Sequence, residues 1–164
     1  MATTETPPDA PTVRLDLRRR APDFYKAMIH LEHAATRELD RAGVDPRLRE
    51  LVRIRASQLN GCAFCLDMHT KDARAIGETE QRIYALSAWR ETPFFTEKER
   101  AALALAESVT LLSVGHVPSD VYAEVTAELA EEEIAALVTL LVTINSWNRI
   151  SVTTRSPVPG SYQR

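Results

Sequence analysis

The sequence is poor in residues that several protein classes need. Only 5 of its 164 residues are glycine, 6% are aromatic and 2 are cysteine. Scarce aromatic residues and glycine, beside abundant alanine and leucine, favour helices over a β-sandwich. A chain of this length also buries a core without disulfide staples, so the two cysteines are not needed for that purpose.

Positive charge and long apolar runs are lacking as well. The formal net charge of −3 excludes the basic surface that nucleic-acid binding needs, and we interpret the cluster Arg18–Arg20 as part of a solvated leader. The N-terminal segment contains Pro7, Pro8 and Pro11 and no apolar stretch of a secretory signal. The longest apolar stretch, residues 134–144, is too short to span a bilayer. We therefore expect a cytoplasmic protein that binds neither nucleic acid nor a membrane.

Proline, glycine and charge divide the chain into three parts. Residues 1–20 are rich in threonine, proline and charge, and we expect a flexible leader there. Residues 21–155 are predicted to form a single helical domain. Residues 156–164 contain two prolines and a glycine, which predict a tail that is not helical.

Hydrophobic spacing predicts an all-α fold, a compact bundle of six or seven helices. The expected helices cover residues 22–41, 46–60, 62–76, 79–89, 96–115, a segment after 118–119, and 131–150. Asp45 followed by Pro46 predicts a helix start, and Thr96 with Glu99 three residues on predicts a capping box. No stretch alternates apolar and polar residues with period two, so no sheet is expected.

The most informative segment holds both cysteines. Cys62 and Cys65 are three residues apart at the expected start of a helix, immediately after Asn60-Gly61. This spacing places both thiols on one face, close enough to form a disulfide. The positive end of the helix dipole stabilises a thiolate there. A fall in pKa from about 8.5 to about 6.5 raises the thiolate fraction at pH 7 from roughly 3% to roughly 75%.

Two further residues are expected to handle protons. His69 lies four residues after Cys65, one helical turn along the same face. Its imidazole can take the proton of Cys65 or pass one to a leaving group. Glu50 lies twelve residues before Cys62, on the preceding helix. If the turn folds that helix back, the carboxylate comes near Cys62 and can relay protons to it.

The residues alone leave alternatives open for the thiol pair. A redox-active dithiol is the favoured interpretation, because in a reducing compartment such a pair is seldom a permanent staple. A zinc site would use Cys62, Cys65 and His69, with Glu50 as the fourth ligand. Inert buried thiols are the third alternative. Haem attachment needs a histidine directly after the second cysteine, and Leu66 stands there.

Other conspicuous polar and aromatic residues are interpreted as structural. His30 and His33 are expected to be partly exposed on the first helix. His116 follows Gly115, where it acts as a helix cap or dipole partner. Trp147 is expected to pack on the core, and the acidic run at 131–133 is expected to open a solvated helix.

The residues around the thiols resemble the alkylhydroperoxidase D-like branch of the carboxymuconolactone decarboxylase family. The likeness rests on Glu50, on the run 59–65 (LNGCAFC) and on His69. The segments 71–74 (KDAR) and 145–149 (NSWNR) also look like that branch. The resemblance extends from about residue 20 to residue 155, and its central motif is the specific part.

This resemblance implies an all-helical fold that assembles into homo-oligomers, either trimers or hexamers. It implies a thiol-dependent peroxidase in which Cys65 attacks the hydroperoxide and Cys62 resolves the product. His69 would deprotonate Cys65, and Glu50 would serve a proton relay. The chemistry would need no metal and no organic cofactor. Electrons would come from an external dithiol reductant such as a lipoyl-bearing protein, with a peroxiredoxin as a downstream acceptor.

One position departs from the family pattern. The prototype has a second histidine immediately before the latter cysteine, and Phe64 stands there in this chain. The relay between Glu50 and Cys62 is therefore altered. The alternatives are a decarboxylase-like acid–base enzyme, in which His69 acts alone, and a general dithiol–disulfide oxidoreductase or redox sensor. True decarboxylases of the family lack the cysteine pair.

Overall fold

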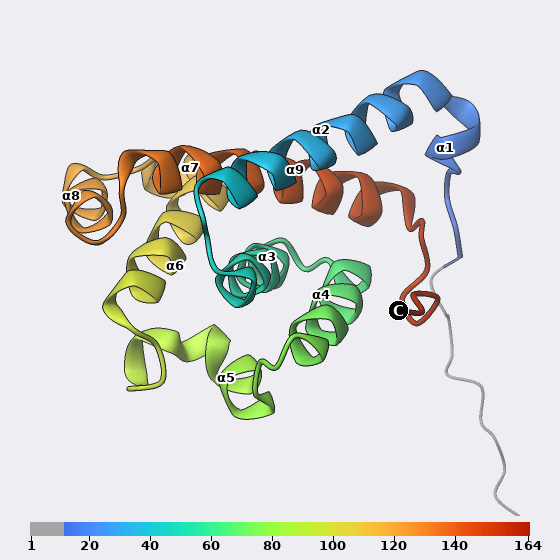
Figure 1. Cartoon of the computed structure of the whole chain (residues 1–164). Helices are drawn as coiled ribbons and strands as arrows, with labels where there is room; N and C mark the ends of the chain where they lie inside the picture. The colour runs from blue at the N-terminus through green and yellow to red at the C-terminus, as the bar shows by residue number, and fades with distance from the viewer. Residues whose placement is uncertain (1–11) are drawn as a thin grey trace, which may run out of the picture.

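The computed structural model describes residues 12–164 and contains helices, with no strand in that range (Figure 1). The elements are α1 (Leu17–Arg20), α2 (Pro22–Arg41), α3 (Pro46–Asn60), α4 (Ala63–Ala75), α5 (Glu80–Ala85), the 3₁₀ helix η1 (Leu86–Glu91), α6 (Glu97–Thr110), α7 (Leu112–Gly115), α8 (Ser119–Glu128) and α9 (Glu131–Thr154). The predicted all-α fold is confirmed. None of the helices in the described range combines the length and the apolar character needed to cross a membrane.

Two helix starts form for the reasons that the sequence indicated. The Asp45 carboxylate accepts the N–H of Arg47 at 2.7 Å, and proline is the first residue of α3. At the start of α6, Thr96 Oγ1 accepts the N–H of Glu99 at 3.2 Å, and the Glu99 carboxylate accepts the N–H of Thr96 at 2.8 Å. These side chains satisfy N–H groups that have no partner inside a helix.

Two predicted helices are divided in the structure, which has more elements than the six or seven expected. The helix predicted over 79–89 becomes α5 and η1. Three residues per turn bring Leu86 and Trp89 above one another, and both are buried. The helix predicted to end at Gly115 breaks at Leu111, where φ is −103° and ψ is 42°. The last helix is longer than predicted and continues to Thr154.

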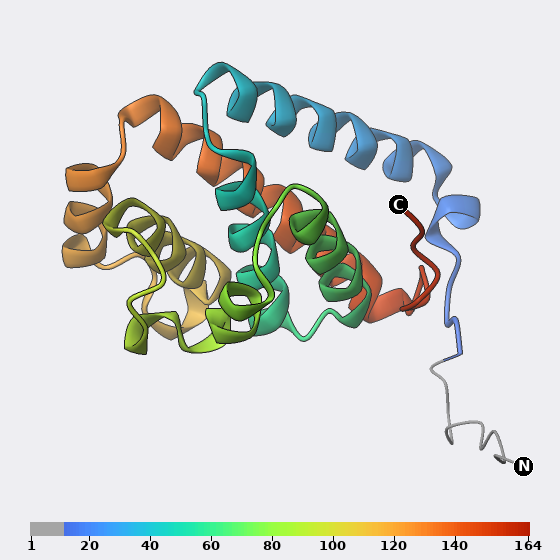
Figure 2. The same ribbon diagram turned by 60° about the horizontal axis from the view of Figure 1, so that its bottom comes forward.

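Helix α3 occupies the centre of the molecule. It packs against α4, α6 and α9, and Figure 2 shows it between α4 and α6. One face of α3 contributes Val52 to a cluster with Leu105 and Leu137. The opposite face contributes Leu51 and Ile54 to a second cluster, toward α4 and η1. Side chains on α3 are therefore enclosed by neighbouring helices, and that of Glu50 is among the buried ones.

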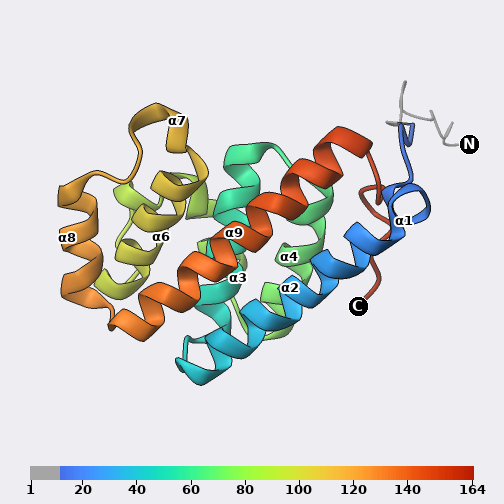
Figure 3. The same cartoon turned by 90° about the horizontal axis from the view of Figure 1, so that it is seen from above.

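Helices α2 and α9 run antiparallel, side by side, over one face of α3 (Figure 3). This pairing brings the first long helix next to the last one, although 89 residues lie between the end of α2 and the start of α9. The second half of α9 lies beside the α3–α4 turn, where Asn60 donates to Asn145 and Asn148. Residues from both ends of the chain thereby surround the cysteine segment.

The two terminal segments make specific contacts where they are described. Residues 1–11 of the expected leader lie outside the described range. Beyond them, the N–H groups of Arg14 and Leu15 donate to the carbonyl of Thr154, and α1 follows. The tail packs on α4, where the Tyr162 hydroxyl donates to Asp72 at 2.8 Å. The division into leader, domain and tail stays a prediction.

Candidate active site

The turn between α3 and α4 positions both cysteines. Gly61 ends α3 with φ 64°, a left-handed conformation that glycine adopts without a Cβ penalty. The N–H of Cys62 then donates to the carbonyl of Ser57 at 3.0 Å. Cys62 is the N-cap residue of α4, with φ −86° and ψ 94°. The short turn therefore sets α4 beside α3 with Cys62 at its start.

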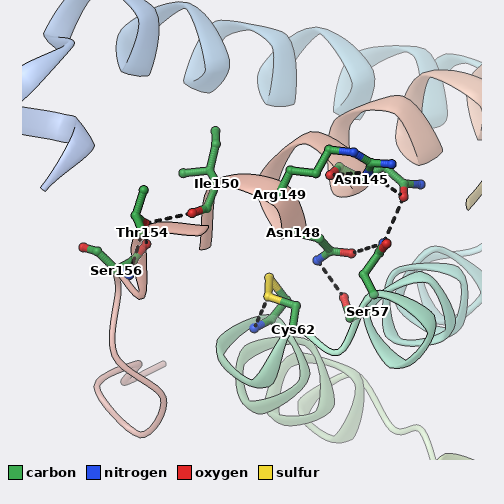
Figure 4. The surroundings of a disulfide bond; sticks show 10 residues. Ser57, Cys62, Asn145, Asn148, Arg149, Ile150, Thr154 and Ser156 are labelled. Carbon is green, nitrogen blue, oxygen red and sulfur yellow. Dashed lines mark hydrogen bonds between the residues drawn. A yellow bond between two sulfur atoms is a disulfide. The ribbon is translucent and has the colours of Figure 1, made fainter. Parts of the chain in front are cut away.

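Cys62 and Cys65 are joined as a disulfide, with their Cα atoms 5.4 Å apart (Figure 4). That separation is ordinary for a disulfide. The N–H of Cys65 also points at the Cys62 sulfur, 3.4 Å away. The exposed fractions of the two residues are 1% and 2%. Helix spacing thus brings the two sulfur atoms together, in a buried place at a helix N-terminus.

His69 and Glu50 form a hydrogen-bonded pair across α3 and α4. Nδ1 of His69 lies 2.9 Å from Oε2 of Glu50, and Arg53 donates to Oε1 of Glu50 at 2.6 Å. Burial raises the pKa of Glu50, but the hydrogen bond and charge of His69, together with Arg53, outweigh it and hold the pKa below the usual value. Glu50 is therefore an ionised carboxylate that orients the imidazole.

This pairing differs from the geometry that the sequence suggested for Glu50. Within the described range, the Glu50 carboxylate forms side-chain hydrogen bonds with His69 and Arg53, whereas the sequence pointed to a relay toward Cys62. Phe64 stands in the position where the prototype has a second histidine. The proton path from Glu50 to Cys62 stays a prediction, and the path from Glu50 to His69 has a direct contact.

Sequence reasoning missed two charged residues that extend the His69–Glu50 pair. Arg53 also donates to Glu32 on α2, at 3.1 Å. Glu32 in turn accepts the indole N–H of Trp147, at 3.2 Å. Trp147 packs against Tyr25, with ring centroids 5.4 Å apart. Nothing local in the sequence marks Glu32 or Arg53, because the packing of α2 on α3 and α9 creates the contact.

A cavity of about 470 Å³ opens beside Cys65, His69 and Glu50. Most of its wall is apolar. The wall includes the aromatic residues Tyr25, Phe64 and Trp147 and the aliphatic residues Ile29, Met68, Ile144 and Ile150. An organic molecule of moderate size fits such a space, with its polar end beside the thiol and the imidazole.

Buried amide groups tie the cysteine turn to α9 (Figure 4). Nδ2 of Asn60 donates to Asn145 and to Asn148, both at 2.9 Å. Asn148 is fully buried and donates to the Ser57 hydroxyl at 3.1 Å. From the sequence, Asn145 and Asn148 were identified only as part of the family resemblance. In the structure they hold the end of α3, from which the turn to Cys62 begins.

The ligand atoms of Glu50, His69 and Asp72 lie within 4.8 Å of one another, a set able to hold a metal ion. This set differs from the zinc site weighed above, because the sulfur atoms are paired with each other. The Arg53 guanidinium and the Tyr162 hydroxyl already bond to Glu50 and Asp72. An arginine so close to the first carboxylate opposes a cation, and the arrangement suits proton transfer better.

The remaining candidates lie where structural residues are expected. His30 and His33 are exposed on α2, and His116 is exposed after α7. Glu133 accepts the N–H of Ala130 at 3.1 Å and so caps α9. Among the described residues, none of these four lines the cavity beside Cys65.

Comparison with known proteins agrees with this architecture. The model of the carboxymuconolactone decarboxylase family matches residues 22–108. The uncharacterized protein YdfG of Bacillus subtilis is 47% identical over 132 residues, which are 80% of this chain and 87% of that protein.

Solved structures share the fold. The crystal structure of ATU0492 from Agrobacterium tumefaciens, a protein of unknown function described as a candidate antioxidant defence protein AhpD, has a TM-score of 0.83 and 38% identity, over 90% of this chain and 99% of that one. The debrominase Bmp8 has a TM-score of 0.74 and 20% identity, over 87% of this chain and 74% of that one. At that level of identity the second likeness concerns the fold alone.

Proposed function

We propose, since the chain belongs to the carboxymuconolactone decarboxylase family and to its alkylhydroperoxidase D-like branch, that it is a thiol-dependent peroxidase acting in a reducing cytoplasm. One observation carries the proposal. Two sulfur atoms joined at a helix N-terminus lie beside a histidine–glutamate pair and an apolar cavity. A dithiol that reduces a hydroperoxide uses a nucleophilic sulfur with a resolving partner, a group that takes up its proton and a space for the substrate.

The first step is attack on the peroxide by Cys65. Glu50 accepts the Nδ1–H of His69, which leaves the other ring nitrogen as the acceptor for the thiol proton. The Cys65 thiolate attacks the terminal oxygen of the hydroperoxide, and the O–O bond breaks. The imidazolium returns the proton to the departing alkoxide, which leaves as an alcohol. Cys65 is oxidised to a sulfenic acid.

The second step closes the disulfide. The sulfur of Cys62 attacks the sulfenic sulfur of Cys65, and the oxygen leaves as water with the thiol proton. The product is the Cys62–Cys65 disulfide that the structure contains. An external dithiol then supplies two electrons and two protons and restores both thiols. A lipoyl-bearing protein remains the proposed source of that dithiol.

The test is turnover of an organic hydroperoxide with dihydrolipoamide, and then with other thiols. We expect Cys65→Ser to lose at least about a hundredfold in rate, because the nucleophile is removed. Cys62→Ser should still form a sulfenic acid once but no intramolecular disulfide. The exposed His33→Gln serves as an unrelated control. Equal turnover by the wild type and Cys65→Ser would remove the proposal.

A second candidate is acid–base catalysis of the decarboxylase type, because the His69–Glu50 pair lines the cavity without needing the thiols. The double replacement Cys62→Ser with Cys65→Ser separates the two functions. Peroxide reduction ends in this variant, whereas lactone decarboxylation by His69 continues. An unchanged rate with a lactone substrate, and none with peroxide, would favour the second candidate.

A further inference from the structure

The disulfide borders two different cavities. The cavity of about 470 Å³ is lined by Cys65 and not by Cys62. A second depression, of about 310 Å³, is lined by Cys62 and not by Cys65. Phe64, Ser151 and Pro157 line both spaces and therefore separate them. The two buried cysteines thus border different spaces.

The Cys62 side is positively charged. Two exposed arginines, Arg14 and Arg155, line this depression, and no carboxylate is among its lining residues in the described part of the chain. The backbone holds both arginines in place. The N–H of Arg14 donates to the carbonyl of Thr154 at 2.9 Å, and the N–H of Arg155 donates to that of Ser151 at 2.9 Å. The Cys65 side, by contrast, carries the carboxylates of Glu32, Glu50 and Asp72 and one arginine, Arg53, which pairs with the first two.

The position of His69 beside Cys65 favours Cys62 as the attacked sulfur. A thiolate that attacks one sulfur expels the other as a thiolate, and the better leaving group is the more stabilised one. Cys65 would leave into the cavity that holds His69, whose imidazole is supported by the Glu50 carboxylate. Attack on Cys65 would have to come through the peroxide cavity, whose charged side chains are three carboxylates and one arginine.

We propose that the reductant binds in the Cys62 depression and is a negatively charged dithiol, attracted by Arg14 and Arg155. This proposal rests on the dithiol function above and names the class of its electron donor. The donor thiolate attacks Cys62, the S–S bond breaks, and Cys65 leaves as a thiolate. The second donor thiol attacks the mixed disulfide, frees Cys62 and closes the donor's own disulfide. Two electrons pass from the donor to the protein.

The test follows the reductive half alone. The full-length protein is oxidised to the Cys62–Cys65 disulfide with diamide, so that no peroxide is needed. It is then mixed with three small monothiols at equal thiolate concentration: 2-mercaptoethanesulfonate, 2-mercaptoethanol and cysteamine. Acid quenching, alkylation and mass spectrometry locate the adduct. We expect it on Cys62, with the anionic thiol faster than the cationic one by about three- to tenfold at low salt.

Variants connect the charge preference to the two arginines. In the double variant Arg14→Gln with Arg155→Gln, the preference should fall to near one, and 0.5 M salt should do the same to the wild type. Arg37→Gln, an exposed arginine on α2, has the same charge change as one replacement and should keep the preference. Dihydrolipoate should likewise reduce the protein faster than neutral dihydrolipoamide.

Two results would overturn the proposal: an adduct located on Cys65, or equal rates for the three monothiols with the wild type. Either of these two results can occur even if the protein reduces peroxide, so neither would contradict the proposed peroxidase function. Conversely, a protein that fails to consume peroxide can still place the adduct on Cys62. The two proposals therefore fail separately.

Discussion

At the scale of single residues, the proposed chemistry depends on the hydrogen bond between His69 and Glu50. A carboxylate on one ring nitrogen fixes the tautomer and the orientation of the imidazole. Glu50 can remain ionised while buried because His69 and Arg53 both bond to it. The pair is therefore oriented for proton transfer before any substrate arrives.

His69→Gln should slow the oxidation of Cys65 by a hydroperoxide by about 10²- to 10⁴-fold, the usual contribution of a general base. Glutamine keeps similar bulk and hydrogen bonding but cannot take up the thiol proton. Single-turnover formation of the disulfide, measured by the loss of free thiols, gives the rate. His33→Gln, on the exposed face of α2, should leave the rate unchanged. A His69→Gln rate within twofold of the wild type would contradict the assignment.

The Glu50 carboxylate should also make stability depend on pH. Its pKa is lower in the folded protein than the ordinary value of 4.5. The stability that its ionised form contributes is therefore fully present above that value and is lost as the pH falls below it. Urea unfolding of the wild type between pH 7 and pH 3 should show this loss, and Glu50→Gln should show a smaller one.

Glu124→Gln on the exposed face of α8 is the matched control for this pH dependence. It should keep the wild-type dependence of the free energy of unfolding on pH. If Glu50→Gln and Glu124→Gln followed the same curve, the ionised carboxylate would not be the cause.

At the scale of elements, the α3–α4 turn determines where the dithiol sits. The turn needs one left-handed residue, Gly61, and it is anchored to α9 through Asn60 and Asn148. Helix α4 then starts with Cys62 at its N-cap and places Cys65 and His69 one turn apart. The left-handed turn, the start of α4 and the anchor on α9 thus bring Cys62, Cys65 and His69 together.

Gly61→Ala should lower the free energy of unfolding by about 1–2 kcal/mol, because a left-handed backbone strains any residue that has a Cβ. A Cβ at this position would meet no atom within 4 Å, so the backbone is the only source of the cost. Gly115→Ala also meets no atom within 4 Å, at a residue without positive φ, and should cost little or stabilise. Urea denaturation measures both, and equal effects would contradict the argument.

At the scale of the whole molecule, α2 and α9 together form an outer layer with apolar residues on its surface. Ile29 and Leu31 on α2 each have an exposed fraction of 39%, and Val138 and Val142 on α9 have 39% and 50%. Val138 and Val142 are four residues apart and share one face of α9, and such a pair of exposed apolar side chains suits a protein contact. The homo-oligomer expected from the family, a trimer or hexamer, stays a prediction.

Val138→Glu combined with Val142→Glu should shift the molar mass in solution toward that of one chain. These residues are four apart on α9, so both charges would stand on one face and resist burial against a second copy. Light scattering after size exclusion measures the mass. Tyr84→Glu, at an isolated exposed residue on α5, should keep the wild-type mass. An unchanged mass for the double variant would place the contact elsewhere.

Whether a feature could be predicted from the sequence depends on how far apart in the chain the interacting residues lie. The Asp45 cap, the Thr96 capping box and the Gly61 turn were predicted because each depends on residues two to four apart. The two cysteines on one helix turn, and His69 one turn farther, follow from the same periodicity. Contacts between residues close in the chain follow from their spacing in the sequence, so a single sequence is enough to predict them.

The sequence by itself determined the all-α fold and the dithiol at a helix start. It also placed His69 on the same helix face as Cys65. Only the tertiary structure decided that Glu50 bonds to His69 and that Arg53 donates a hydrogen bond to Glu32. It also decided that Cys62 and Cys65 border different cavities. The two hydrogen bonds join different helices, between residues 19 and 21 positions apart in the chain. Their geometry depends on how the helices pack, and helical periodicity carries no information on which neighbour a face will meet.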